Sequence, residues 1–292
     1  VDIAKTMNGL ASLCCAEQDW EEALRWMQRA QEHVRHSGKT LSQITKDEEG
    51  DSDDNLMMVP PLPDAMHISL FIKILDNTAW IYRHQHLFGT ALETYREISK
   101  LLDLRQQQNQ DDEDDSPRPK NDDNDIDDDL LSQMQIDVRL DIADCQSALG
   151  EHEEAKEMYE ELLSRKETES SPLEGVLHHN LGLIYAKQNQ PHLAMESLHK
   201  ALKCKRAFVE ETHAEMGKTW NVMGAVLASN QQPRQALVYF RHAVLIARIH
   251  DDQEEVRQIE RNIAMVQENL HTPFSTNGGG GGGNPFSTRR LK

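Results

Sequence analysis

Histidine pairs are the first candidates for metal or acid–base chemistry in this chain, and their spacing favours neither. His84 and His86 lie two residues apart, and His178 and His179 are adjacent, so the members of each pair point in different directions on a helix. A third pair, His33 and His36, could share a helical face. Ordinary histidines on a helix surface are the simpler interpretation of all three pairs.

The four cysteines also form no recognisable site. They lack the CxxC spacing of zinc ligands, and their arrangement does not resemble a disulfide framework. We therefore expect free thiols and a reducing, cytoplasmic location. The cysteines are Cys14, Cys15, Cys145 and Cys204.

A run of acidic residues could in principle bind calcium. The EF-hand loop needs a glycine at its sixth position and a glutamate at its twelfth, and loops started at Asp111 or Asp123 have neither. The chain also contains no HExxH, no GxSxG and no phosphate-binding glycine-rich loop. We predict no catalytic residue, no metal ligand and no cofactor.

The charge balance narrows the classes of partner. The chain has 292 residues with 50 acidic and 31 basic side chains, which gives a formal charge of −19. This argues against a nucleic-acid partner, since such proteins present basic patches. No apolar run approaches the ~20 residues needed to span a bilayer, so no membrane partner is expected. Most of the excess negative charge lies in residues 46–54 and 111–129.

An internal repeat supplies the elements that must position any site. Five alanines share a surrounding pattern, with a large apolar residue four positions later, another apolar or small residue seven positions later, and a small residue twelve positions earlier. Offsets of three, four and seven place side chains on one face of a helix. Each repeat is therefore predicted to form two helices joined by a short polar turn. The two helices should approach each other most closely where the small residues lie. The alanines are Ala23, Ala91, Ala155, Ala194 and Ala236.

These units resemble tetratricopeptide repeats. The nearest match is Trp220-x2-Met223-Gly224-x2-Leu227, followed by Ala236-x3-Phe240. The wider spacing of the last three repeats is somewhat similar to the kinesin light chain group. The resemblance implies an all-α, right-handed superhelical solenoid of stacked helical hairpins.

The register divides the chain into repeats and inserts. The two inserts are acidic, and the first also contains the helix-breaking VPPLP. A helix over 253–270 is expected to cap the last repeat, and a flexible Gly-rich tail follows it. Because the chain starts at Val1 rather than at a methionine and Asp2 leads directly into a repeat, we expect a fragment or a processed chain. The repeats are 1–36, 65–105, 133–168, 172–209 and 213–250; the inserts are 37–64 and a disordered 106–132; the tail is 271–292.

The resemblance implies that the first helix of each hairpin lines a concave groove for a peptide or a helical segment. An asparagine suits such a groove because its amide can donate to and accept from a peptide backbone, although a solvated amide is an equal alternative. Trp80 could anchor a partner or pack against a neighbouring repeat. The groove candidates are Lys73, Asn77, Trp80, Asp141, Asp144, His179, Asn180, Lys218 and Asn221, with Lys5, Asn8, Ser12, Asp76, Asp137 and Leu183 beside them.

The acidic members of this set bear on the kind of ligand. Asp137, Asp141 and Asp144 favour a ligand with Lys or Arg and a salt-dependent on-rate. The carboxylate clamp of co-chaperone repeats is incomplete: Val222 and Leu140 stand where that clamp needs basic residues. A chaperone C-terminal tail is therefore disfavoured as the ligand.

Three functional hypotheses remain. The first is a non-catalytic scaffold or adaptor that binds a protein or peptide ligand in the concave groove. The second is a structural subunit that self-associates or belongs to a larger assembly. The third is a regulatory repeat region of a larger parent protein.

Overall fold

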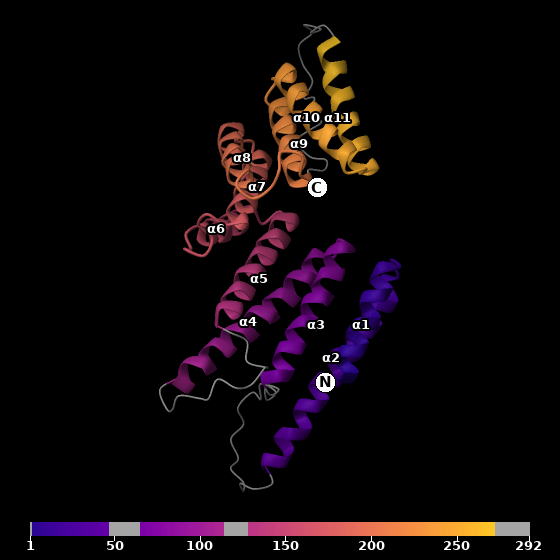
Figure 1. Ribbon diagram of the computed structural model, residues 1–292, viewed down its shortest axis with the longest axis vertical. Coiled ribbons are helices and arrows are strands. Elements are labelled where there is room, and N and C mark those ends of the chain that lie inside the picture. Colours follow the sequence, from indigo (N-terminus) through magenta and orange to yellow (C-terminus); the bar gives the residue numbers. More distant parts are fainter. Residues whose placement is uncertain (1, 47–64, 114–127, 272–292) are drawn as a thin grey trace, which may run out of the picture. The chain divides into compact units, whose positions relative to one another are not determined.

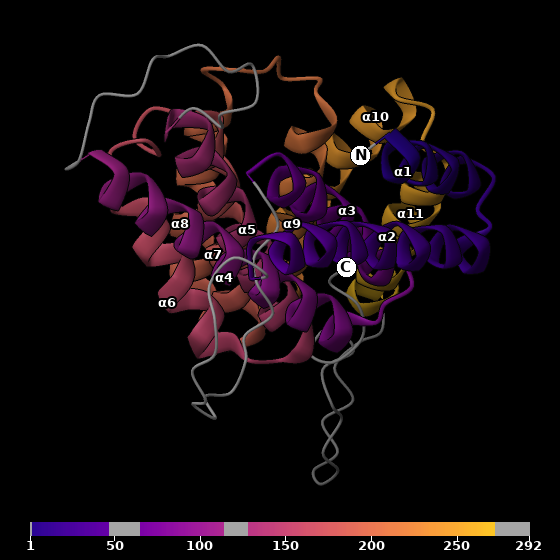
Figure 2. The same cartoon turned by 90° about the horizontal axis from the view of Figure 1, so that it is seen from below.

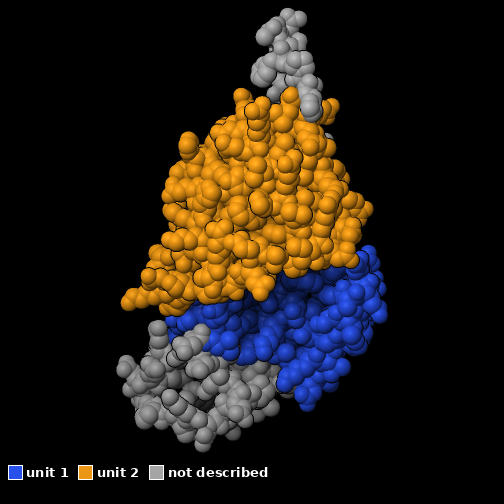
Figure 3. All heavy atoms as spheres, turned by 45° about the horizontal axis from the view of Figure 1, so that its top comes forward, with its two compact units in different colours: residues 1–151 blue, residues 152–292 orange. Residues whose placement is uncertain are grey.

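A computed structural model describes the backbone of residues 2–46, 65–113 and 128–271. Over these ranges the chain forms eleven α-helices and no strand, which confirms the all-α prediction. The helices fall into two compact units, residues 1–151 and residues 152–292 (Figure 3). The third predicted repeat contributes one helix to each unit.

In its described residues the first unit has five helices, each of which packs against the next along the chain. Two of its helices run further than the repeat register predicts, to Lys46 and to Glu113, so helix occupies the start of both predicted inserts. The second insert also ends within a helix that begins at Asp128. Residues 47–64 and 114–127 lie outside the described residues. The helices are α1 (Asp2–Ala16), α2 (Trp20–Lys46), α3 (Ala65–His84), α4 (Phe88–Glu113) and α5 (Asp128–Leu149) (Figure 1).

Between residues 152 and 271 the second unit has six helices. Its tightest pairs are α7 with α8 and α9 with α10, and α7 and α8 run side by side in both Figure 1 and Figure 2. Proline stands at the start of α7, α8 and α10, where its missing N–H has no intrahelical acceptor in any case. The helices are α6 (His152–Leu163), α7 (Pro172–Lys187), α8 (Pro191–Lys205), α9 (Ala214–Ser229), α10 (Pro233–Ile249) and α11 (Gln253–His271).

The repeat pattern coincides with the core. All five anchor alanines are 0 % exposed, and the large residues four positions later are at most 1 % exposed. One position departs from the pattern: Leu10 is 36 % exposed, whereas its equivalents in the later repeats are buried. Leu10 lies on α1, the first helix of its unit.

Small residues lie where helices approach closely, as the pattern predicts. A Cβ on Gly224 would lie 2.7 Å from two ring atoms of Phe240, and one on Gly182 would lie 2.7 Å from Cγ of Leu198. Both pairs join the two helices of one hairpin. A larger residue at either glycine would push the helices apart.

The turns within the hairpins share one backbone motif. In each, a residue with positive φ follows the helix, and the next N–H donates to the carbonyl five residues earlier, as in the Schellman motif. The residues with positive φ include Gln18, His86, Gly150, Asn189 and Gln231. The corresponding bonds include Asp19 N to Cys14 O and Gln190 N to Tyr185 O, both 2.9 Å. The same turn therefore recurs with different residues.

Helix α11 covers the last hairpin, as predicted. Its residues Val256, Ile259 and Val266 are at most 7 % exposed and belong to the same apolar cluster as Phe240, against which Ile263 also packs. The tail from residue 272 lies outside the described residues.

Candidate functional site

A pocket of about 500 Å³ opens among the helices of the first unit. Eight of its ten lining residues come from α1, α3 and α5, the first helices of their hairpins. Met27 of α2 and Tyr95 of α4 complete the wall. The eight are Ser12, Cys15, Ala16, Asp76, Asn77, Trp80, Arg83 and Asp141.

One arginine, Arg83, forms ion pairs with two acidic residues at this pocket. Arg83 Nη1 donates to Asp141 Oδ1, and Arg83 Nη2 lies 3.3 Å from Asp144 Oδ2. The guanidinium also forms a hydrogen bond with Tyr95. Because these side chains are only 26–30 % exposed, the ion pairs are better shielded from solvent than a surface salt bridge. Two of the acids expected to attract a basic ligand are thus engaged within the protein.

The acids of the pocket still outnumber its cations. Burial raises the pKa of Asp141 to about 6; Arg83 opposes the rise, and Asp144 and Asp76 add to it. Burial and the charge of Asp137 raise the pKa of Asp76 above its ordinary value. Burial alone would lower the pKa of Arg83, but Asp141, Tyr95 and Asp144 outweigh it and raise that pKa. The pocket therefore favours additional positive charge.

An amide and an aromatic side chain flank these charges. Asn77 Nδ2 donates to Oδ1 of Asn8 on α1 at 2.9 Å, so the two predicted groove amides link α3 to α1. The ring of Trp80 is 43 % exposed. Its centroid lies 3.9 Å from that of His84 and 6.0 Å from that of Trp20. Trp80 is therefore held by rings on its own helix and on α2 while it also lines the pocket.

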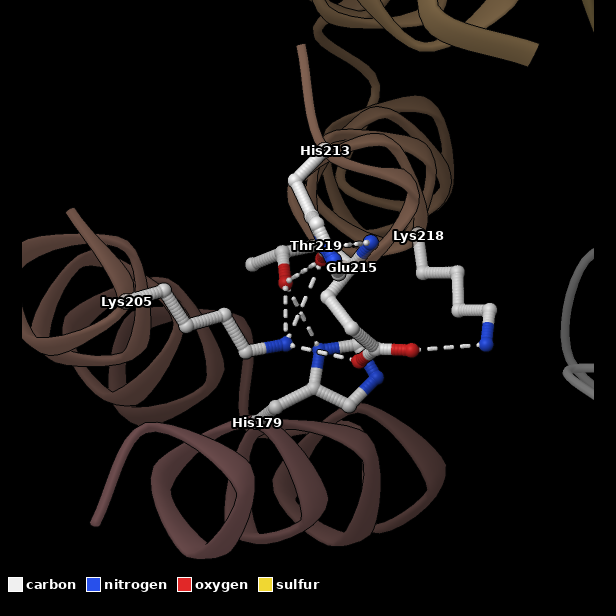
Figure 4. Close-up of polar contacts among 6 residues, drawn as sticks. All are labelled: His179, Lys205, His213, Glu215, Lys218 and Thr219. Atoms are coloured by element: carbon white, nitrogen blue, oxygen red, sulfur yellow. Dashed lines mark hydrogen bonds and ion pairs between the residues drawn. The ribbon is translucent and has the colours of Figure 1, made fainter. Parts of the chain in front are cut away.

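The second unit contains a polar cluster around a buried lysine (Figure 4). Lys205 of α8 is 5 % exposed, and its Nζ lies 3.1 Å from Glu215 Oε2 and 3.2 Å from Thr219 Oγ1. His179 of α7 reaches the same Thr219 hydroxyl at 3.1 Å through Nδ1. Lys218 Nζ donates to the other carboxylate oxygen, Glu215 Oε1, at 2.7 Å. The cluster joins α7, α8 and α9.

The pKa values of the cluster fit a structural role. Burial and the charge of Lys205 lower the pKa of His179 to about 3, so this histidine is neutral at physiological pH. Burial alone would raise the pKa of Glu215, but the two lysines outweigh it and lower that pKa to about 2. Burial lowers the pKa of Lys205 from its ordinary value, and Glu215 opposes this. Both lysines therefore share one counter-charge within the protein, the carboxylate of Glu215.

The predicted groove residues divide between the two units. Asn77, Trp80 and Asp141 line the pocket, Asp144 pairs with Arg83, and Lys73 is exposed on α3. In the second unit, His179 and Lys218 belong to the polar cluster. Asn180 is half-buried, and Asn221 accepts a hydrogen bond from Asn262 of α11 at 3.5 Å. The role of all nine in ligand binding stays a prediction.

Sequence reasoning missed Arg83 and Lys205. Arg83 follows Asp76 by seven residues and Trp80 by three, which places the three on one face of α3. Lys205 lies eleven residues after an anchor alanine, where other repeats have the buried Val34 and Leu102. Extending the repeat pattern by one turn would have predicted its burial.

The described residues hold no group of three or more metal-ligating side chains, and none of their helices is long and apolar enough to cross a membrane. All four cysteines are free thiols. Burial raises the pKa of the Cys145 thiol to about 11, which disfavours the reactive thiolate. The cytoplasmic location stays a prediction.

Comparisons with known proteins agree with this architecture. The family described as tetratricopeptide repeat matches residues 6–39, 136–169 and 176–208. A search of curated protein sequences found no significant match.

Among solved structures, the apo form of RapI superposes with a TM-score of 0.59 at 14 % identity, over 91 % of this chain and 82 % of that one. The Rap conjugation gene regulator of plasmid pLS20 gives 0.56 at 12 % identity, over 90 % and 61 %. The apo quorum sensor NprR from B. thuringiensis gives 0.53 at 16 %, over 92 % and 58 %. At these identities the likeness concerns the fold.

The fold and the repeat pattern define an all-α protein built from repeated helical hairpins with a C-terminal capping helix. Within it, residues 6–39, 136–169 and 176–208 match the tetratricopeptide-repeat family. The kinesin light chain likeness and the right-handed superhelical sense stay predictions.

Proposed function

We propose that this protein is a non-catalytic scaffold or adaptor that binds a segment of another protein against the first helices of its hairpins. The observation that carries the proposal is the pocket of the first unit, because α1, α3 and α5 supply most of its lining. Apolar walls with a few convergent polar groups are typical of binding sites. The chemistry of the pocket suits recognition better than catalysis, since two of its charged residues, Arg83 and Asp141, form an ion pair with each other.

The fold is compatible with peptide binding. The pLS20 Rap regulator, which shares the fold, was solved in complex with the Phr* peptide. This chain spans 61 % of the length of that regulator, so its ligand does not transfer to this protein. What transfers is the suggestion that stacked hairpins of this kind can hold a peptide.

Selection of random peptides displayed on phage would test the proposal with the full chain as the target. Trp80→Ala removes an exposed ring from the pocket, and Phe208→Ala is a matched control because Phe208 is 46 % exposed and lies outside the pocket. Selected peptides should lose at least about tenfold in affinity with Trp80→Ala, since anchoring aromatics contribute ~2 kcal/mol or more. They should bind Phe208→Ala as tightly as the unchanged chain.

Two results would contradict the proposal. One is a selection that enriches no peptide above background. The other is a set of peptides that bind the chain with Trp80→Ala as tightly as the unchanged chain, which would place the interface elsewhere. Circular dichroism of both variants would show that each retains its helices.

Self-association is a second candidate function, and one observation favours it. Ile3, Leu10 and Leu13 of α1 are 56 %, 36 % and 64 % exposed, and their spacing forms an uncharged stripe on the first helix. Exposed apolar stripes of this kind often mark interfaces. A dimer mass at micromolar concentration that Leu13→Glu converts to a monomer mass would support this candidate. Monomers in both samples would exclude it.

A further inference from the structure

Asp76 differs from Asp141, the other acid that lines the pocket, and from the nearby Asp137 and Asp144. Asp141 and Asp144 share Arg83, and Asp137 accepts a hydrogen bond from Gln133 at 2.9 Å. Asp76 lines the pocket, and it forms no hydrogen bond or ion pair with any residue in the described part of the chain. Its carboxylate is therefore the acid of the pocket that is available to a ligand.

The surroundings of Asp76 make a negative charge there unfavourable without a counter-ion. Asp76 is an exposed residue, but partial burial of its carboxylate and the negative charge of Asp137 raise its pKa. Arg83 attracts it, but that guanidinium is already committed to two other carboxylates. A cation from outside would relieve both effects.

Trp80 lines the same pocket as Asp76 and could contact the same ligand. It lies four residues after Asp76, so both side chains project from one face of α3 into the same pocket. A planar guanidinium can stack on an indole while its N–H groups donate to a carboxylate, which a lysine ammonium cannot do in the same way. Asn77, next to Asp76 in sequence, also lines the pocket, and an amide oxygen can accept a hydrogen bond.

We infer that the pocket holds an arginine side chain of the bound segment, with the guanidinium between the carboxylate of Asp76 and the indole of Trp80. This inference rests on the proposed function and specifies what the bound segment must carry. It also moves the expected acidic contact from Asp137, Asp141 and Asp144 to a residue of α3. Arg83 and Asp141, which also line the pocket, stay paired with each other and do not contact the arginine of the ligand.

The experiment compares three blocked tripeptides that differ in the central residue: arginine, lysine, or citrulline, which is the neutral isostere of arginine. The full chain, labelled with ¹⁵N, has four tryptophan indole signals, and a Trp80→Phe variant identifies that of Trp80. The arginine peptide should shift this signal at concentrations at least about tenfold lower than the citrulline peptide, because only arginine forms the charge-assisted bond. The lysine peptide should lie between them.

Asp76→Asn should weaken the arginine peptide by about tenfold or more and leave the citrulline peptide nearly unchanged. Glu93→Gln is the matched control, since it removes one negative charge from an exposed position of α4 outside the pocket. Equal affinity for the arginine and citrulline peptides would overturn the inference without any variant, and so would an Asp76→Asn chain that binds arginine normally.

The outcomes separate the inference from the proposed function. Phage-selected peptides that require Trp80 but contain no arginine would refute the arginine site and leave the scaffold function standing. A failure to select any peptide would refute the scaffold function itself. A set of Trp80-dependent peptides enriched in arginine would support both.

Discussion

Gly224 offers the sharpest test of how the hairpins pack. In Gly224→Ala, the new methyl would lie 2.7 Å from Cδ1 and Cε1 of Phe240 and 3.0 Å from Cγ. Phe240 is 0 % exposed and sits in the apolar cluster that α11 covers, so its ring has little room to move. Overpacking of this kind costs ~1–3 kcal/mol.

The helix propensity of alanine opposes this cost. Replacing glycine by alanine inside a helix gains ~1 kcal/mol, so Gly224→Ala should destabilise the second unit by a net ~1 kcal/mol. Gly9 is the matched control, because it lies within α1 and a Cβ there meets nothing within 4 Å. Gly9→Ala should stabilise the first unit by ~0.5–1 kcal/mol.

Native-state hydrogen exchange is a suitable assay because it reports the stability of each region separately. Amides of α9 and α10 would report on Gly224→Ala, and those of α1 and α2 on Gly9→Ala. Gly224→Ala should also be less costly in a Phe240→Leu background, where the smaller side chain leaves space. An alanine at 224 that stabilises its unit as much as one at 9 would refute the close-approach reasoning.

Three other perturbations test the charged residues. Lys205→Met keeps the packing of the side chain but removes the ion pair with Glu215, so urea denaturation should show a loss of ~1–3 kcal/mol. For Asp141 the folded pKa is raised to about 6, so its contribution to stability is present below pH ~4 and lost as pH rises through 6. The stability of the unchanged first unit should therefore fall relative to that of Asp141→Asn between pH 4 and 7, by ~2 kcal/mol in hydrogen exchange. For His179 the folded pKa is lowered to about 3, so the opposite trend applies: stability relative to His179→Gln falls as pH drops from 7 to 4. Trends of the reverse sign would contradict these assignments.

The fold was predictable because the same pattern of buried residues occurs in five repeats. A single alanine with an apolar residue four positions later is a weak signal, but Ala23, Ala91 and their three equivalents in register leave few alternatives. The exposed Leu10 shows the limit of the pattern. Periodicity assigns a face to a residue, and whether another helix covers that face depends on the position of the repeat in the stack.

The candidate site was only partly predictable, for a related reason. The register predicted Asn77 and Trp80 on the first helix of a hairpin, and both lie on α3 and line the pocket. It could not show that Arg83 of α3 reaches Asp141 of α5, since that pairing depends on how two hairpins pack. Consequently the sequence could not show that Asp141 is already paired within the protein.

Hydrogen–deuterium exchange with a phage-selected peptide tests the central claim most directly, because it locates binding without any substitution. Binding in the pocket should slow exchange in α1 and α3, the helices that supply most of the pocket lining. Slower exchange confined to α10 and α11, with α1 and α3 unchanged, would contradict the claim that the pocket of the first unit is the binding site.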